Sequence, residues 1–185
     1  MRRWHPVRHF KTITGHRRLV RKYCFRLGLY RQGLMHDMSK YSPTEFLRGA
    51  KFYQGDKSPN DAERKETGVS LAWLHHKGRN KHHFEYWIDY RQEPDGSVVF
   101  AGNPMPMRYI AEMFCDRIAA CRIYLGEKYT DASPYEYFAR RRDRLLIYPD
   151  TAEKLELMLK ILRDQGEEKA FAYVRRRLKE EKHGV

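Results

Sequence analysis

Residues 33–40, with the sequence GLMHDMSK, carry the groups most suited to chemistry. An imidazole, a carboxylate and an ammonium group lie within five residues there, as His36, Asp37 and Lys40. Imidazole nitrogen and carboxylate oxygen both bind divalent metals, and a lysine ammonium suits a phosphate. Because adjacent residues of a helix point about 100° apart, His36 and Asp37 can share one ion only where the backbone lies close to it.

Further candidate ligands lie on both sides of this pair. Eight of the nine histidines precede residue 84, and four of these form a downstream cluster: His75, His76, His82 and His83. Asp116 follows in a strongly apolar segment, where a buried carboxylate needs a metal or a cationic partner such as Arg117. A mixed nitrogen and oxygen set suited to Mn, Fe, Co, Ni, Zn or Mg is thus available: His16, His36, Asp37 and Asp116.

Hydrophobic periodicity and capping signals predict the helices that would position these groups. The clearest start signal is the sequence SPTE at residues 42–45, a capping box with proline at the first helical position. Turn and strand signals favour a small hairpin or ordered loop near residues 91–103. The predicted fold is all-α with about eight helices, at residues 6–27, 30–38, 43–53, 62–77, 107–125, 133–146, 152–165 and 167–182, and a short one at 82–89.

Length and composition predict one globular domain over residues 1–185, with its core at about 6–126 and a C-terminal helical extension at about 133–182. The three cysteines lack CxxC spacing and suggest reduced thiols rather than a disulfide framework. No secretory leader and no apolar run long enough to span a membrane are apparent. We therefore expect a cytoplasmic protein without a membrane partner.

The chain is strongly basic, with 37 Lys and Arg against 24 Asp and Glu, a formal net charge of +13. Such a charge favours anionic partners, which include phosphorylated metabolites and nucleic acid, although a solvated basic surface is an equal alternative. The basic runs at 140–142 and 175–179 have acidic neighbours and fit a solvated face better than a nucleic-acid contact.

The order of His16, His36-Asp37 and Asp116 resembles the HD-domain superfamily of metal-dependent phosphohydrolases, over about residues 10–126. The His-Asp-x-x-Lys form at residues 36–40 is similar to that of HD-GYP phosphodiesterases and of di-iron HD oxygenases. Residues 73–87 also resemble an uncharacterised HD-like family of bacteria and phages, which implies no activity. A Gly-Tyr-Pro motif is missing after the histidines, so specificity for cyclic dinucleotides is not supported.

The resemblance implies an HD-like helical bundle in which His16, His36, Asp37 and Asp116 bind a first metal. It assigns Lys40 to a substrate phosphate or a developing oxyanion, and it assigns the downstream histidines to a second metal or to the phosphate. Among them we favour His75 and His82 as catalytic, since seven residues are two helical turns, but His76 and His83 have the same spacing. Arg79 and Asn80 are candidates for substrate contact, and Glu85 and Asp89 for orienting an imidazole.

We therefore predict a phosphohydrolase that uses one or two divalent metal ions on a phosphomonoester or phosphodiester, nucleotide-like in kind. A di-iron oxygenase on the same scaffold is the first alternative. A non-catalytic nucleic-acid-binding protein with a structural metal is the second. The two enzymatic hypotheses require the His-Asp set to bind metal for chemistry, whereas the third does not.

Overall fold

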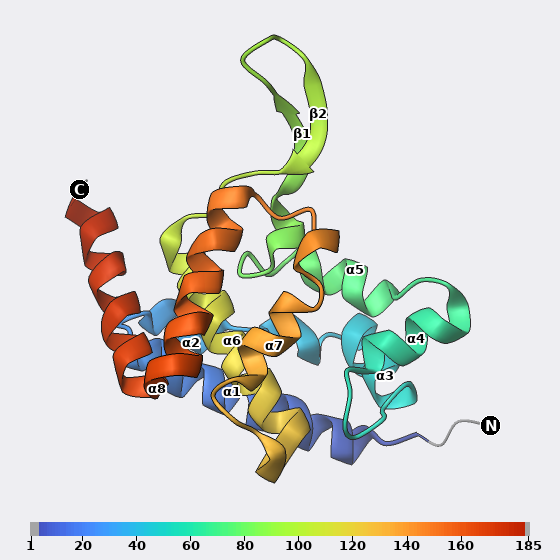
Figure 1. Cartoon of the computed structure of the whole chain (residues 1–185). Helices are drawn as coiled ribbons and strands as arrows, with labels where there is room; N and C mark the ends of the chain where they lie inside the picture. Colours follow the sequence, from blue (N-terminus) through green and yellow to red (C-terminus); the bar gives the residue numbers. More distant parts are fainter. Residues whose placement is uncertain (1–3, 184–185) are drawn as a thin grey trace.

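The computed structural model describes residues 4–183. This part of the chain contains eight α-helices, four short 3₁₀ helices and one two-stranded antiparallel sheet, so the predicted all-α fold is confirmed (Figure 1). No helix in it combines the length and apolar character needed to cross a bilayer. The α-helices are α1 (Pro6–Arg26), α2 (Tyr30–Met35), α3 (Pro43–Lys51), α4 (Pro59–Thr67), α5 (Leu71–Lys77), α6 (Met107–Leu125), α7 (Ser133–Ala139) and α8 (Pro149–His183). The remaining elements are η1 (Met38–Tyr41), η2 (Phe84–Trp87), η3 (Gly126–Lys128), η4 (Arg142–Arg144), β1 (Ile88–Gln92) and β2 (Val98–Gly102).

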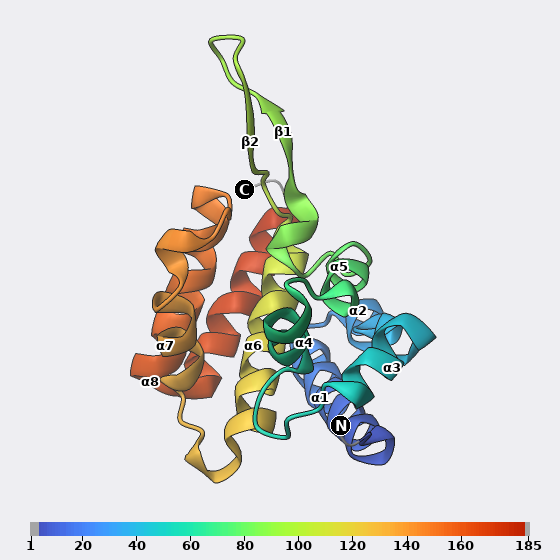
Figure 2. The same ribbon diagram turned by 90° about the vertical axis from the view of Figure 1, so that its right-hand side faces the viewer.

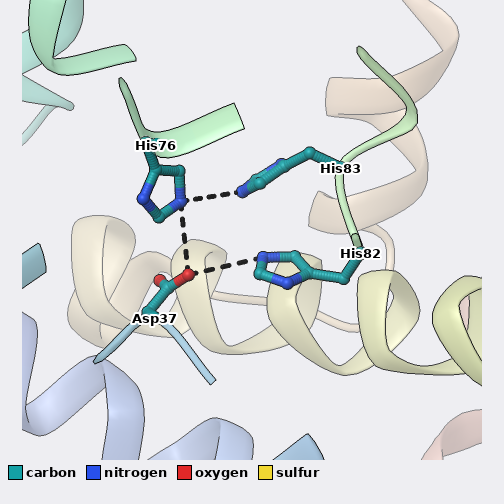
Figure 3. Close-up of side chains that lie close together, drawn as sticks. All are labelled: Asp37, His76, His82 and His83. Carbon is teal, nitrogen blue, oxygen red and sulfur yellow. Dashed lines mark hydrogen bonds and ion pairs between the residues drawn. The ribbon is translucent and has the colours of Figure 1, made fainter. Parts of the chain in front are cut away.

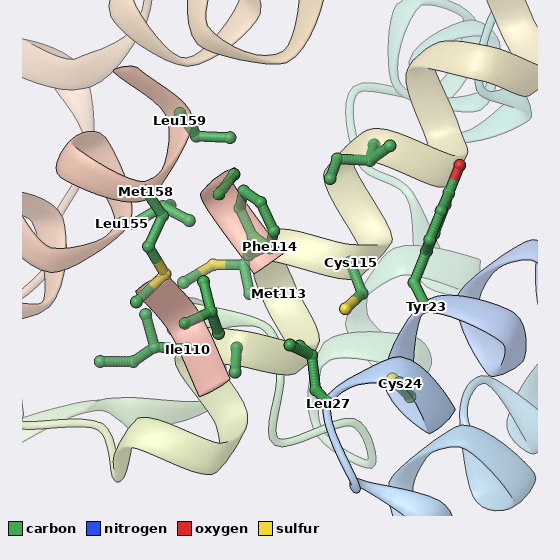
Figure 4. Close-up of a cluster of buried hydrophobic side chains, with 14 of the residues drawn as sticks. Tyr23, Cys24, Leu27, Ile110, Met113, Phe114, Cys115, Leu155, Met158 and Leu159 are labelled. Atoms are coloured by element: carbon green, nitrogen blue, oxygen red, sulfur yellow. The ribbon is translucent and has the colours of Figure 1, made fainter. Parts of the chain in front are cut away.

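The hydrophobic core lies where α6 packs against α1 on one side and α8 on the other. Phe114 of α6 and Tyr23 of α1 both contact the ring of Phe171 in α8, with ring centroids 5.6 and 5.5 Å apart. Figure 4 shows the same packing, with side chains of α8 reaching those of α6. The C-terminal region is thus part of the main core, and its description as an extension of a core that ends near residue 126 is corrected.

Several predicted helix boundaries are wrong, and each has a local cause. The helix predicted at 62–77 is divided into α4 and α5, because Gly68 adopts a left-handed conformation (φ 79°) and Ser70 caps a new helix. The helix predicted at 30–38 ends at Met35. Residues 82–89 form a turn, η2 and the start of β1 instead of one helix. The predicted division between the two C-terminal helices is correct, because Gly166 has a non-helical backbone (φ 82°, ψ 173°) that kinks α8 at this residue.

The predicted hairpin is present as β1 and β2, and it extends away from the helices in both views (Figures 1 and 2). Tyr90 is paired with Phe100 across the two strands, and their rings lie 5.5 Å apart. Both side chains are largely exposed, at 73% and 58%. The hairpin therefore contributes little to the core, and the site is built from the helices below it.

The three thiols are not bonded to one another. Cys24 and Cys115 are buried in the core, where they face each other between α1 and α6 (Figure 4). Burial raises the pKa of the Cys115 thiol well above its usual value, and burial also raises the pKa of Cys121 to about 11. The thiols of Cys115 and Cys121 are therefore protonated at neutral pH and are poor nucleophiles.

Candidate metal centre

Three segments that lie far apart in the sequence bring the first predicted ligand set together. His16 comes from α1, His36 and Asp37 from the turn between α2 and η1, and Asp116 from α6. The contacts of α1 with both α2 and α6 hold these segments in place. His16, His36 and Asp37 are buried, and the Asp116 side chain is 16% exposed.

The atoms of this set that could bind metal converge on one point. His16 Nε2 lies 3.0 Å from Asp116 Oδ1 and 3.4 Å from Asp37 Oδ2, and the Nε2 atoms of His16 and His36 lie 3.4 Å apart. Ligands about 2.1 Å from a shared ion lie about 3.0 to 3.4 Å apart at right or tetrahedral angles. The spacing therefore fits a single ion, and we call these four residues group 1.

The local backbone explains how adjacent residues can face one ion. Asp37 is the one non-glycine residue with positive φ (53°) among those described, a conformation that aspartate tolerates better than most residues. Arg17 of α1 donates hydrogen bonds to the carbonyls of His36 (2.7 Å) and Leu34 (3.0 Å), which hold the turn against α1. The helix ends before His36, so the constraint of about 100° between neighbouring helical residues no longer applies.

A second convergent set lies on the other side of the Asp37 carboxylate (Figure 3). Asp37 Oδ1 lies 3.2 Å from His76 Nε2 and 3.4 Å from His82 Nε2, and the Nε2 atoms of His76 and His83 lie 2.9 Å apart. We call Asp37, His76, His82 and His83 group 2. Asp37 thus offers Oδ2 to group 1 and Oδ1 to group 2.

Unsatisfied polar atoms support a cation at both groups. Neither carboxylate oxygen of Asp37 nor Nε2 of His82 has a hydrogen-bond partner among the described residues, although all three atoms are buried; the Lys40 ammonium forms an ion pair with Asp37 Oδ2 only. Buried polar atoms are nearly always satisfied, and an ionised carboxylate in particular needs a compensating positive charge. In two pairs of imidazoles, His16–His36 and His76–His83, the Nε2 atoms face each other. A cation bound between the two nitrogen lone pairs would account for this arrangement as well. The donor set therefore fits metal ions at these positions.

Two buried glutamates contact the imidazoles at Nδ1, the ring nitrogen that does not face the candidate metal positions. Glu112 Oε1 lies 2.9 Å from His36 Nδ1 and 3.2 Å from His82 Nδ1. Glu45 Oε2 lies 2.8 Å from His76 Nδ1. A carboxylate that accepts the Nδ1 proton leaves the Nε2 lone pair for a metal. Glu112 was not among the site residues predicted from the sequence. Glu45 was predicted only as part of the capping box at residues 42–45.

His75 lies outside both groups, so the preference for His75 is corrected. Its Nδ1 contacts Glu45 Oε1 at 2.6 Å, whereas His76 contacts the other oxygen of this carboxylate, and His75 belongs to neither convergent set. The argument from two helical turns does not hold, because α5 ends at Lys77 and residues 82 and 83 follow in a turn. His82 does lie in group 2, together with His76 and His83.

The charges around Asp37 stabilise its ionised form. Burial alone opposes ionisation, but His36 and Lys40 hold the pKa of the Asp37 carboxyl well below its usual range. Lys40 Nζ lies 2.6 Å from Asp37 Oδ2, and although burial opposes its charge, Asp37 and Asp116 raise the pKa of the Lys40 ammonium. Burial, reinforced by His82 and His76, lowers the pKa of His83, so that this imidazole is neutral and able to act as a ligand.

The predicted substrate and orienting residues have other positions. Asn80 is buried, and its amide donates to Ser39 Oγ (2.9 Å) and to the His76 carbonyl (2.8 Å), so it supports group 2 rather than facing solvent. Arg79 is exposed at the rim of a cavity beside His36 and His82. Asp89 is exposed on β1, and the buried Oε2 of Glu85 has no hydrogen-bond partner among the described residues.

Residues 5–161 match a family of unknown function (DUF5662). The chain belongs to DUF5662. No curated protein and no solved structure matches it. The DUF5662 match includes every residue of groups 1 and 2 and both glutamates behind them, but the family description carries no activity. Any function must therefore be argued from the geometry of the site.

Proposed function

We propose that this DUF5662 protein is a metal-dependent phosphohydrolase with an HD-type centre for two divalent ions. The observation that carries the proposal is the position of the Asp37 carboxylate, which directs one oxygen to group 1 and the other to group 2. A carboxylate shared in this way is suited to two ions about 3.5 to 4 Å apart, the arrangement used by many phosphatases and nucleases.

His16, His36 and Asp116 would hold the first ion with Asp37, and His76, His82 and His83 would hold the second. Such ions polarise a phosphoryl oxygen and lower the pKa of a water molecule that serves as the nucleophile. Five of these seven side chains offer nitrogen, which favours Mn, Fe, Co, Ni or Zn over Mg, since Mg prefers oxygen ligands.

Lys40 would bind the phosphate. Its side chain is 28% exposed, compared with 1% for Asp37, so Lys40 is the more accessible partner of this ion pair beside group 1. Asp116 of group 1 is also partly exposed, at 16%. A phosphoryl group that enters beside Lys40 would meet a permanent positive charge, which would also stabilise charge that develops in the transition state.

The proposed substrates are phosphomonoesters or phosphodiesters of nucleotide-like compounds. The net charge of +13 supports an anionic substrate, because a strongly basic protein attracts anions over distance. Tyr124 lies near enough to Lys40 and Asp116 for their charges to affect the pKa of its hydroxyl, which burial raises.

The neighbouring residues His75 and His76 provide a matched test of this proposal. Both contact Glu45 through Nδ1, but only His76 directs Nε2 toward Asp37. We expect the protein loaded with Mn, Fe, Co, Ni or Zn to release phosphate or alcohol from a panel of phosphate esters. His76→Ala should remove this activity, whereas His75→Ala should retain most of it. Equal activity in the two variants would contradict the proposal.

An iron-dependent oxygenase is the second candidate, and the nitrogen-rich donor set is what favours it. The two enzymatic functions differ in their products. Oxygen uptake by the iron-loaded protein, without hydrolysis of any ester in the panel, would support the oxygenase. Salt-sensitive binding to nucleic acid that survives His76→Ala, without either activity, would instead support a binding protein.

A further inference from the structure

A cavity of about 520 Å³ lies next to the metal centre, between α2, the turn after α5 and the start of α6. Its wall on the metal side includes Glu112 and the imidazoles of His36 and His82. Both imidazoles contact Glu112 through Nδ1 and belong to groups 1 and 2 through Nε2. The two rings therefore separate this cavity from the metal positions, and a ligand could bind in it without contacting a metal.

Four cationic side chains from three separate segments line this cavity: Arg31, Arg79, Lys81 and Arg108. Arg31 comes from α2, Arg108 from the first turn of α6, and the other two from the turn after α5. Their convergence depends on the tertiary structure, and no basic run in the sequence indicates it.

No carboxylate of the described residues neutralises the charges of these four side chains, because none of the four forms an ion pair with one. The contacts they do make are with neutral groups: Arg79 donates to the His75 carbonyl at 3.3 Å, and Arg108 lies 5.0 Å from the ring centroid of Tyr109. The one carboxylate in the wall, Glu112, already faces two imidazoles.

We propose that this cavity binds an anion with two or more phosphate groups, at a site distinct from the metal centre. Four like charges around one concavity repel one another, and the field they focus there attracts a polyanion. Guanidinium groups match phosphate oxygens in a bidentate geometry, and three of the four cations are arginines. The volume falls within the range of about 300 to 1,000 Å³ typical of small-molecule sites. This site goes beyond the proposed phosphohydrolase and does not depend on it.

Calorimetric titration of the metal-free protein with inorganic triphosphate tests the proposal. We expect saturable binding to the wild type, and binding weakened by about a hundredfold in Arg31→Ala/Arg108→Ala, because two charge-assisted contacts are lost. Arg18→Ala/Arg21→Ala is the matched control, since it removes the same charge from exposed positions of α1 outside the cavity. This control should bind nearly as the wild type does.

The variant Asp37→Asn separates the cavity from the metal centre. Triphosphate binding should persist in it, whether or not the protein is a phosphohydrolase. Equal weakening in the two arginine double variants would show diffuse attraction to a basic protein and would overturn the proposal. Loss of binding in Asp37→Asn, or no binding to the wild type at millimolar triphosphate, would also overturn it.

Discussion

His36 Nδ1 lies 2.9 Å from Glu112 Oε1, a carboxylate 76 residues farther along the chain. The same oxygen lies 3.2 Å from His82 Nδ1. One buried glutamate therefore contacts an imidazole of each metal group, because His36 belongs to group 1 and His82 to group 2. This relationship couples the orientation of the two groups and makes Glu112 as informative to mutate as a ligand.

Glu112→Gln should lower metal affinity by about 10- to 100-fold, as is typical when the partner of a ligating imidazole is lost. The amide is uncharged, so its oxygen is a weaker acceptor for the two Nδ1–H groups than the carboxylate oxygen, and both rings are held less firmly in orientation. Competition with a chromophoric chelator would measure the affinity. The control is Glu127→Gln, at an exposed position in η3. Identical affinities in the two variants would exclude an orienting role for Glu112.

His9 should make the folded state sensitive to acid. Burial, with the nearby charge of Lys40, lowers the pKa of His9 from 6.5 to about 4. The unfolded chain therefore takes up a proton before the folded chain does, so this part of the stability is complete above pH 6.5 and is lost as the pH falls toward about 4. Between these two pH values, the free energy of unfolding should change by at most about 1.4 kcal/mol per pH unit because of His9.

Urea unfolding of the metal-free protein at several pH values between about 4 and 7.5 measures this effect. The variant His9→Gln cannot take up the proton, and its free energy of unfolding should therefore depend less on pH than that of the wild type. Parallel pH profiles for the two proteins would show that His9 is not the group responsible.

Gly49→Ala should destabilise the protein although alanine is the better helix former. The imidazole of His9 occupies the space that a Cβ at Gly49 would need, so this buried ring or the helices α1 and α3 must shift. The expected loss in the free energy of unfolding is about 1 to 3 kcal/mol. Gly15→Ala is the matched control, because its Cβ would meet only the end of the Ile123 side chain at 3.4 Å. Thermal unfolding should show a lower midpoint for Gly49→Ala and an unchanged or higher midpoint for Gly15→Ala.

Much of group 1 could be predicted from residue types alone. His36-Asp37 and an aspartate in an apolar helix require cationic partners once buried, and the structure brings both together with His16. A signal for Glu112 was also present, because it precedes Asp116 by four residues and so shares its face of the helix. That spacing alone is weak evidence, since a glutamate in a helix is usually a surface residue.

The second group could not be predicted in the same way. The choice between His75 and His76 depends on how α5 is rotated, and both face Glu45. Residues 82 and 83 lie beyond the end of α5, where helical periodicity no longer applies. Their spacing from the histidines of α5 therefore does not predict where their side chains point. Similarly, the return of α8 onto α6 depends on tertiary packing, which local hydrophobic patterns do not specify.

The most direct test of the central claim is the metal content of the wild type and of Asp37→Asn after reconstitution with Mn, Fe, Co, Ni or Zn. Asp89→Asn is the matched control, because this aspartate is exposed on β1. A two-ion centre predicts about two equivalents per chain in the wild type and in the control. It predicts loss of metal from Asp37→Asn, together with a lower melting temperature than that of the loaded wild type. The same metal content in Asp37→Asn, or no bound metal in any of the three proteins, would contradict the account.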